Sequence, residues 1–317
     1  MTLLFRDASG PRLGSRRSVV CIGAFDGVHI GHQRLLAQVR QRADALSADA
    51  VAISFEPLPR EFFQRGGPIA RLSSARQKFE RLRDAGMHSV GLLRFNRVLA
   101  DTSAEDFVQR LLVDRLAACE IWIGPDFRFG HGRLGDVTLL RQLGAVNGFA
   151  AHAIDGMEHA LGRVSSSRIR QALQSADLGA AKAMLGRDFS ISGCVVHGLK
   201  LGRTLGYPTA NLPLGKRIPP VHGIYAVRVS GAGLRDWPSV ASLGTRPTIA
   251  GRELLLEAHL FDFNGDLYGQ RLEVAFVGKL RDEEKFDNLN ALVVQMDIDA
   301  AQARALLAPA TNVGVTQ

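Results

Sequence analysis

Residues 19–32, VVCIGAFDGVHIGH, specify how the N-terminal half of the chain folds. The segment Val19 to Gly23 is apolar enough for a buried strand, and the glycine-rich loop after it leads into a helical pattern that we expect to begin near Gln33. A strand, a glycine-rich loop and a helix in this order are typical of a phosphate-binding site, because a helix start presents unpaired N–H groups and a positive dipole end to an anion. The three glycines of the loop, Gly23, Gly27 and Gly31, would let the backbone approach such a ligand closely.

Two histidines of this stretch are candidate catalytic residues. His29 and His32 are three residues apart, so they can face one ligand and stabilise charge that develops on an α-phosphate during nucleotidyl transfer. The alternative is a helix-capping turn that contains two surface histidines. A zinc pair is disfavoured, because no Cys, Glu or further His lies at ligand spacing nearby.

The pattern of the first stretch continues to about Leu185. Short apolar runs alternate there with amphipathic segments, which predicts an α/β, Rossmann-like domain with a parallel sheet and crossover helices. Capping-box spacing, in Ser74 with Gln77 and in Thr102 with Glu105, supports two of the helices. The further expected strands are Ala50 to Phe55, Val90 to Phe95, Cys119 to Gly124 and Phe149 to Ile154.

The amino-acid pattern of the chain changes after Gly186. Gly, Pro and Thr now separate β-rich runs, and a helical period returns from Asp282 to Leu307. This pattern predicts a β-barrel or sandwich with helices packed on it. We therefore expect two domains, residues 1–185 and 186–317. The β-rich runs are Ile224 to Val229, Leu254 to Leu260 and Leu272 to Val277.

Composition limits the classes of protein. Residues 1–17 carry too many charges for a signal peptide, and no apolar run of about 18 residues occurs, so we expect a cytoplasmic chain without a membrane partner. Cys21, Cys119 and Cys194 are far apart, which encodes neither a disulfide framework nor a zinc site. A net charge of +8 suits phosphate-bearing ligands, and the scattering of the basic residues among acids argues against nucleic acid.

The N-terminal motifs resemble a known family. HIGH, residues 29–32, resembles the signature of the nucleotidylyltransferases and class I aminoacyl-tRNA synthetases, and the longer GAFDGVHIGH resembles the FAD synthetase module of the prokaryotic bifunctional riboflavin kinase/FAD synthetases. FEPLP (55–59), GPDFRFGHGRLGD (124–136) and RVSSSRIR (163–170) follow in the family's order. The resemblance implies nucleotide or flavin binding by Gly23, Phe25, Asp26, Gly31, Asp126, Phe127, Arg163, Ser165, Ser166, Ser167, Arg168 and Arg170.

Physical chemistry supports the serine and arginine segment, because hydroxyls at a helix start together with arginines can cradle the β- and γ-phosphates of ATP. The alternative is a cluster of capping serines with solvated arginines. Two other glycine patterns are rejected. The glycines Gly130, Gly132 and Gly135 do not follow a strand directly, and GLKLGRT (198–204) is one residue short of a Walker A loop and has Arg203 in place of its lysine.

The C-terminal half resembles riboflavin kinase. GLKLGRTLGYPTANL, residues 198–212, matches the kinase signature apart from Tyr207, which stands for the commoner Phe. The resemblance implies phosphate binding at Gly198, Gly202 and Pro208, and Mg²⁺ ligation by Thr209 and Asn211, whose oxygens suit this ion. Glu257, in LEAHLFDF, matches the position of the general base, although its place among apolar residues would also fit an ordinary strand residue.

Together these motifs predict an enzyme that phosphorylates riboflavin with ATP and then adenylates FMN to FAD, with Mg²⁺ in both steps. Its expected partners are the small-molecule flavins and ATP, and no nucleic acid; a homo-oligomer is possible on this sequence. Three rivals stay open: an enzyme with one degenerate site, a tRNA-binding synthetase-like protein, and a flavin-storage protein that consumes no ATP.

Overall fold

The computed structural model describes residues 2–63, 68–154, 158–159, 162–198, 202, 205–248 and 251–308. The chain divides into two compact units, of which the first comprises Met1–Ile69 and Ser73–Arg168. The second comprises Ala70–Leu72 and Ile169–Gln317. Among the helices that the structure describes, none combines the length and the apolarity that a membrane crossing needs.

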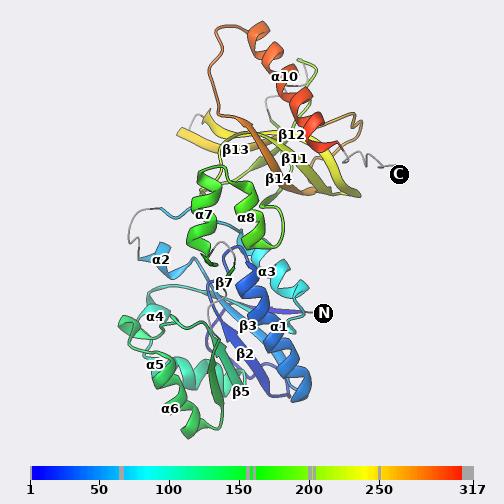
Figure 1. Ribbon diagram of the computed structural model, residues 1–317. Coiled ribbons are helices and arrows are strands. Elements are labelled where there is room, and N and C mark those ends of the chain that lie inside the picture. Colours follow the sequence, from blue (N-terminus) through cyan, green and yellow to red (C-terminus); the bar gives the residue numbers. More distant parts are fainter. Residues whose placement is uncertain are drawn as a thin grey trace, which may run out of the picture. The chain divides into compact units, whose positions relative to one another are not determined.

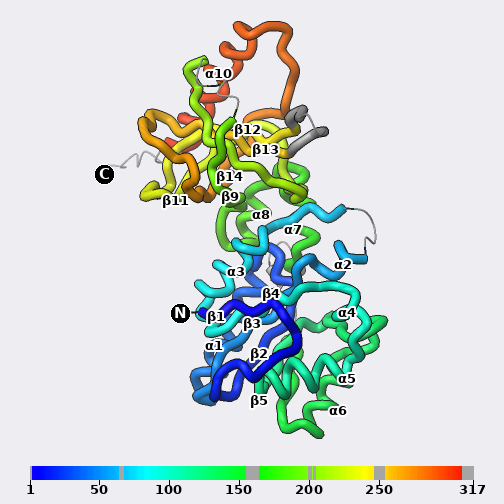
Figure 2. Tube along the Cα trace, turned by 180° about the vertical axis from the view of Figure 1, so that it is seen from behind, coloured from blue at the N-terminus to red at the C-terminus, as the bar shows by residue number. Residues whose placement is uncertain are grey.

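The first unit contains a six-stranded sheet in which all neighbours are parallel, with the order β1-β4-β3-β2-β5-β6. All five predicted strands are confirmed. The edge strand β1 was not predicted, because it has only three residues, of which Phe5 alone is buried; Figure 2 shows it beside β4. The strands are β1 Leu3–Phe5, β2 Ser18–Ile22, β3 Asp49–Glu56, β4 Ser89–Arg94, β5 Ala118–Ile123 and β6 Ala150–Ala153.

Helices cover both faces of this sheet, as Figure 1 shows. Alternate residues of β2 point to opposite faces, so Val19 and Cys21 pack against α1 (Ile30–Ala45) and α3 (Ala75–Asp84). Val20 and Ile22 pack on the other face. This burial on both faces explains why the strand is apolar from Val19 to Ile22. The second face is covered by α5 Ala104–Phe107, the π-helix η1 Val108–Arg115 and α6 Val137–Asn147; α2 Pro59–Phe62 and α4 Arg97–Ala100 are single turns.

Two helix starts differ from the sequence-based prediction. α1 begins at Ile30 and not near Gln33, because His29 is its N-cap. The predicted capping box at Ser74 and Gln77 is confirmed. The one at Thr102 and Glu105 is wrong by one residue: the N-cap of α5 is Ser103, which accepts from the Asp106 N–H, while the Thr102 hydroxyl donates to the Val98 carbonyl oxygen.

The second unit contains an antiparallel six-stranded sheet that is nearly closed into a barrel, with the order β10-β13-β12-β11-β14-β9. Its two end strands meet where the Val196 N–H donates to the Asn211 carbonyl oxygen at 2.9 Å. The predicted β-rich runs are confirmed as β11, β13 and β14. The strands are β9 Ser190–Cys194, β10 Ala210–Pro213, β11 Gly223–Gly231, β12 Leu234–Thr248, β13 Gly251–Leu260 and β14 Arg271–Arg281.

One long helix, α10 (Leu289–Leu307), packs on β11, β12 and β14 of the barrel. Ala303 and Leu307 of this helix share a small core with Ala226 and Phe261. The predicted helical stretch therefore begins later than Asp282, since residues 282–288 form no regular element. The remaining elements are α7 Ser166–Gln174, α8 Leu178–Leu185 and the short strands β7 Glu158–His159 and β8 Gly162–Arg163.

Candidate active sites

The loop after β2 has a constrained backbone. Three of its residues have positive φ angles: Phe25 at 47°, Gly27 at 85° and Val28 at 44°. This conformation is costly for an aromatic or β-branched residue, so it persists only where the surroundings impose it, and both side chains are buried. Of the three glycines, Gly27 alone has positive φ, and Gly31 lies inside α1; the close approach of the backbone to a ligand stays a prediction.

The structure brings the two candidate histidines together. The rings of His29 and His32 are stacked with centroids 3.7 Å apart. The rings of Phe25 and His32 meet edge to face with centroids 5.0 Å apart. The Nδ1 atom of His29 accepts from the His32 N–H at 3.3 Å, so this histidine also caps α1. The capping turn of the alternative interpretation is thus real, but its histidines are not two independent surface side chains: His29 is buried and His32 is half-buried.

The environment of His32 favours the neutral imidazole. Burial, and then the nearby His29 and Lys78, hold the pKa of His32 well below its ordinary value of 6.5. Its Nδ1 atom is buried and has no hydrogen-bond partner within the described part of the chain. A neutral ring with one polar atom unsatisfied can hydrogen-bond a ligand without a prior change of protonation.

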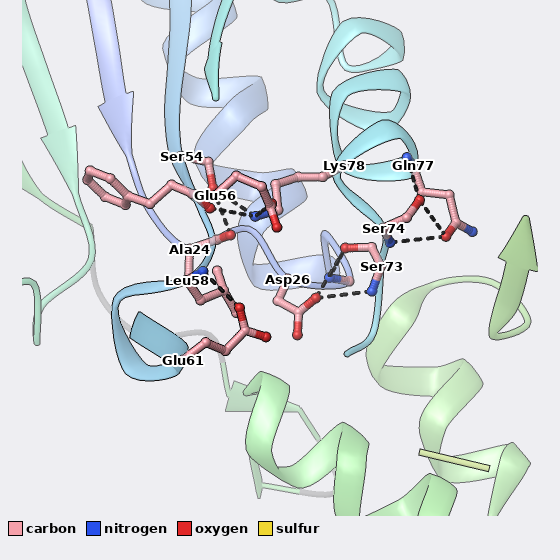
Figure 3. Close-up of polar contacts among 12 residues, drawn as sticks. Ala24, Asp26, Ser54, Glu56, Leu58, Glu61, Ser73, Ser74, Gln77 and Lys78 are labelled. Atoms are coloured by element: carbon pink, nitrogen blue, oxygen red, sulfur yellow. Dashed lines mark hydrogen bonds and ion pairs between the residues drawn. The ribbon is translucent and has the colours of Figure 1, made fainter. Parts of the chain in front are cut away.

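Asp26 turns toward the protein. Its Oδ1 accepts from the Ser73 N–H at 3.0 Å and from the Ser73 hydroxyl at 3.2 Å, and the Gly27 N–H donates to the Ser73 Oγ at 3.1 Å. Figure 3 shows Asp26 and Ser73 facing each other between the loop and the start of α3. The Ser166 hydroxyl donates to the Asp26 carbonyl oxygen at 2.9 Å. Asp26 therefore joins two motif segments, and its predicted contact with nucleotide stays a prediction.

A buried lysine that the sequence did not single out lies under the same loop. The Nζ of Lys78 is 3.2 Å from a carboxylate oxygen of Glu56, 3.2 Å from the Ser54 Oγ and 3.3 Å from the Phe55 carbonyl oxygen. The Ser54 hydroxyl in turn donates to the Ala24 carbonyl oxygen at 2.9 Å (Figure 3). The sequence signal that could have revealed Lys78 is its rarity, since it is the only lysine before residue 182.

Asp126 and Phe127 follow β5, which pairs in parallel with β2. Their segment therefore begins at the same edge of the sheet as the histidine loop. Phe127 packs on the core and stacks on Phe129, whereas Asp126 is exposed. The rejected glycine pattern that follows is a turn closed by backbone hydrogen bonds between Phe129 and Gly135, and not a strand-to-helix loop.

The serine and arginine segment forms the start of α7. The Ser165 Oγ accepts from the Arg168 N–H at 3.3 Å, as in the capping alternative. Ser167 is exposed. Arg170 donates from Nε to the Ala70 carbonyl oxygen at 2.6 Å. Arg163 lies in β8, with its side chain outside the described residues, and phosphate binding by this segment stays a prediction.

In the second unit, four side chains form a row across four neighbouring strands. Asn211 on β10 is directly opposite Glu257 on β13, Glu257 is opposite Ser242 on β12, and Ser242 is opposite Ile224 on β11. Directly paired residues point to the same face of a sheet, so the predicted base and the predicted metal ligand are neighbours. Glu257 is thus not isolated among the apolar residues that flank it in sequence.

This row lines a cavity of about 340 Å³. A second cavity of about 330 Å³ lies beside it, and Thr209 lines both. Pro208, whose carbonyl oxygen is 2.8 Å from the His259 Nδ1, lines the second. The first cavity is lined by Gly202, Leu205, Tyr207, Thr209, Asn211, Ile224, Val240, Ala241, Ser242, Glu257, His259, Arg281, Glu283, Glu284, Phe286, Leu292, Met296 and Asp299.

Two glycines of the kinase motif are required by close packing. A Cβ on Gly198 would come within 2.7 Å of the Asn211 amide nitrogen. A Cβ on Gly202 would come within 2.3 Å of the Tyr207 carbonyl oxygen. Both predicted positions therefore lie against the segment that carries Thr209 and Asn211, and any side chain there would displace it. The residues 199–201 and 203–204 between and after them lie outside the described residues.

Helix α10 and the end of β14 complete the first cavity with residues that the sequence did not single out. Arg281 donates to the buried Asp299 carboxylate at 2.8 Å, and the Tyr207 hydroxyl hydrogen-bonds to Asp297. Burial and this contact raise the pKa of Tyr207 to about 12. Burial also raises the pKa of Glu283. Asp297 and Asp299 lie outside the motifs, so no sequence signal indicates these contacts.

Comparisons with known proteins agree with this geometry. Residues 13–168 match the family model described as FAD synthetase, and residues 185–307 match the one described as riboflavin kinase. A bifunctional riboflavin kinase/FMN adenylyltransferase from Pseudomonas fluorescens is 45% identical over 98% of this chain and 99% of its own. The enzyme of the same description from Escherichia coli K12 is 42% identical over 90% of this chain and 91% of its own.

A solved structure, described as a macrolide-efflux protein from Streptococcus pneumoniae, aligns with a TM-score of 0.80 and 29% identity over 95% of this chain and 99% of its own. Full-length similarity to the two enzymes, with both family models in the expected order, confirms the resemblance that the motifs carried. The chain belongs to the bifunctional riboflavin kinase/FMN adenylyltransferases.

Proposed function

We propose that, in this enzyme, which makes FMN from riboflavin and FAD from FMN, the two cavities of the barrel are the kinase site. The observation that carries this proposal is the row of Asn211 and Glu257 in one cavity, next to Thr209, which lines both. The first cavity takes riboflavin, because it combines the only proposed base with apolar walls from Ile224 and Met296. The second takes the nucleotide, so that the γ-phosphate meets the ribityl hydroxyl at Thr209.

In the proposed phosphorylation, Glu257 accepts the proton of the terminal ribityl hydroxyl as its oxygen attacks the γ-phosphate of ATP, and ADP leaves. Thr209 and Asn211 supply neutral oxygens to Mg²⁺, which balances the phosphate charge when it is bound. The donor set fits this ion, because the Thr209 hydroxyl and the Asn211 side-chain amide offer neutral oxygens and both residues line the first cavity.

In the proposed adenylation, a phosphate oxygen of FMN attacks the α-phosphate of ATP in line, and pyrophosphate leaves. His29 and His32 stabilise the charge on the α-phosphate, and the backbone of the loop at Gly23, Phe25 and Gly31 approaches the nucleotide. The β- and γ-phosphates lie at the start of α7. The side chains proposed for that contact are Arg163, Ser165, Ser166, Ser167, Arg168 and Arg170.

The proposal assigns adenylation to residues 1–185 and phosphorylation to residues 186–317. It further places the enzyme in the cytoplasm, with flavins and ATP as its partners, with Mg²⁺ in both steps, and without nucleic acid. Association into a homo-oligomer is a separate question that light scattering answers.

The test is Glu257→Gln, which keeps the shape of the side chain and removes the proton acceptor. FMN formation from riboflavin should fall about a hundredfold or more, as expected when a positioned general base is lost. FAD formation from added FMN should be unchanged, because that nucleophile is an ionised phosphate. Loss of neither activity would make Glu257 an ordinary strand residue. Flavin binding without ATP consumption would favour a storage protein, and a salt-dependent shift of tRNA would favour a synthetase-like one.

A further inference from the structure

We propose that Lys78 is a positioning residue for FMN adenylylation, which holds the histidine loop to the end of β3 from beneath. The inference rests on the proposed assignment of that loop to the adenylylation site. Lys78 itself touches no substrate in this proposal. Its ammonium group instead fixes the backbone from which the side chains of the loop extend.

The first argument is the environment of the ammonium group. The Lys78 side chain is fully buried, and its three donor positions are matched by three acceptors: the Glu56 carboxylate, the Ser54 hydroxyl and the Phe55 carbonyl oxygen. A buried ion pair is weak evidence for stability, because removing both charges from water costs about as much as their attraction returns. A well-packed apolar side chain would serve as well if packing were the only requirement. We therefore infer that the ion pair fixes the position of the groups that it contacts.

The second argument is the path from Lys78 to the histidines. Ser54 is also fully buried, and it accepts from Lys78 and donates to the Ala24 carbonyl oxygen, 2.9 Å away. The next residue is Phe25, whose ring contacts His32 and whose φ of 47° must be imposed from outside. A continuous series of contacts thus runs from Lys78 through Ser54 and the backbone of the loop to His32, as Figure 3 shows for its polar part.

The third argument is that the start of α3 contacts the loop at two points. Ser73, which directly precedes the N-cap Ser74 of α3, binds Asp26 and the Gly27 N–H. Lys78, in the second turn, binds the other end of the loop through Ser54. Contacts at both ends of the loop, one from Ser73 and one through Ser54 on β3, restrict both the position and the tilt of the loop, which a single contact could not do.

The fourth argument is residue choice. The chain has 39 basic Lys and Arg residues, and Lys78 is the only lysine among the first 181. The planar guanidinium of Arg cannot bind three acceptors arranged around a point, whereas an ammonium group can. Among these residues, lysine therefore replaces arginine at the one position where a compact cation binds three acceptors.

The test uses the full-length enzyme; far-UV circular dichroism and the unfolding temperature report the folding of the first unit, which contains Lys78, and the rate of riboflavin phosphorylation reports that of the second. Four variants are compared: Lys78→Met, Lys78→Gln, the double variant Lys78→Met/Glu56→Gln, and Ser54→Ala. Arg76→Met is the matched control, since Arg76 forms an exposed ion pair with Glu80 on the same helix. For each variant, kcat and the KM values for FMN and ATP are measured in FAD formation, together with the unfolding temperature.

We expect Lys78→Met and the double variant to lower kcat about 30-fold or more, with the KM for FMN within threefold of wild type, because misplacement of the loop affects the transition state more than flavin binding. Lys78→Gln, whose amide keeps two of the three N–H donors without the charge, should recover part of this loss. Ser54→Ala should lower kcat about three- to tenfold and Arg76→Met not at all. Riboflavin phosphorylation should be normal throughout.

Three results would overturn the proposal. The first is wild-type kcat in the folded double variant. The second is wild-type kcat in Ser54→Ala, which keeps the Lys78–Glu56 ion pair and removes the hydroxyl that links Lys78 to the Ala24 carbonyl oxygen; this variant decides the question even if both Lys78→Met proteins fail to fold. The third is a loss of FAD formation in Lys78→Met that Lys78→Gln does not relieve at all. If His32→Ala also leaves FAD formation intact, the proposed site itself is wrong, and not only the role of Lys78.

Discussion

Removal of α8 tests where the kinase domain begins. The proposed boundary lies at Gly186, whose left-handed backbone ends α8, whereas the longer segment of the second compact unit begins at Ile169 and includes that helix. α8 contacts β14 of the barrel, and Ala181, Met184 and Leu185 are buried. We therefore compare two fragments, residues 169–317 and 186–317. Both contain every residue proposed for the kinase, so at low temperature both should phosphorylate riboflavin.

The two fragments should differ in stability. Full burial of one Leu or Met side chain contributes about 1.5–3 kcal/mol, so the loss of Met184 and Leu185 should cost about 4 kcal/mol. The estimate is an upper bound, because unfolded chains already bury some apolar surface. Domains of this size are stable by only about 5–15 kcal/mol. With a urea dependence of about 1.5 kcal/mol per molar, the shorter fragment should unfold about 2–3 M earlier.

The assay is urea unfolding of both fragments, followed by far-UV circular dichroism, with FMN formation measured on the same samples. Leu185→Ala in the longer fragment isolates one buried side chain and should cost about 2–5 kcal/mol, while Lys182→Ala, on an exposed position of the same helix, should cost less than about 0.5 kcal/mol. Equal urea midpoints for the two fragments would refute the packing argument and support a boundary at Gly186. A folded longer fragment that binds riboflavin and ATP but makes no FMN would refute the kinase assignment.

Three further predictions concern single side chains. His32→Ala should lower FAD formation from FMN about 10²–10³-fold and leave FMN formation unchanged, because one charge contact in the transition state is worth about 3 kcal/mol; near-normal FAD synthesis by the folded variant would contradict the assignment. Tyr207→Phe removes the hydroxyl bonded to Asp297 and should raise the KM for riboflavin about three- to tenfold in proportion to one hydrogen bond, whereas an unchanged KM would show that α10 closes the cavity without it. The low pKa of His32 means that the folded protein binds fewer protons than the unfolded chain below pH 6.5, so stability should fall as the pH decreases through 6.5. Urea midpoints at pH 7.5 and 5.5 should therefore differ more for wild type than for His32→Gln, and an equal difference would mean that His32 titrates normally.

The strands of the parallel sheet and the β-rich character of the second unit could be predicted from the sequence, because both depend on residues that are close together in the chain. A strand buried on both faces, such as β2, is apolar along its length, here from Val19 to Ile22, and the β-rich runs of the barrel lie between turn residues. β1 gave no such signal, since three residues with one buried side chain are too few. The start of α1 was misplaced for a different reason: histidine is an uncommon N-cap, so the helix was expected only where ordinary helix formers begin.

The candidate site was predictable only as far as its motifs extend. Motif spacing indicated His29, His32, Asn211 and Glu257, and the strand register explains why the last two are neighbours. Spacing could not show that Asp26 points toward Ser73, because the two residues are 47 positions apart and meet only when β2 and α3 pack. Tyr207 and Asp297, 90 positions apart, are hidden from the sequence in the same way.

Two polar contacts hold the histidine loop in the first unit: the contact of Ser73 with Asp26 and the contacts of Lys78. They differ in how many specific residues the sequence must supply. The Ser73 contact to Asp26 needs one hydroxyl and one backbone N–H, which many sequences can supply at a helix start. The Lys78 contact needs a cation, a carboxylate and a hydroxyl on two elements in one register, and the buried cation or the buried hydroxyl alone would be a costly group. Selection for stability would remove such a set more easily than it could build one. Its presence directly beneath the histidine loop therefore argues that the geometry of this loop, and not the stability of the sheet, is what the set maintains.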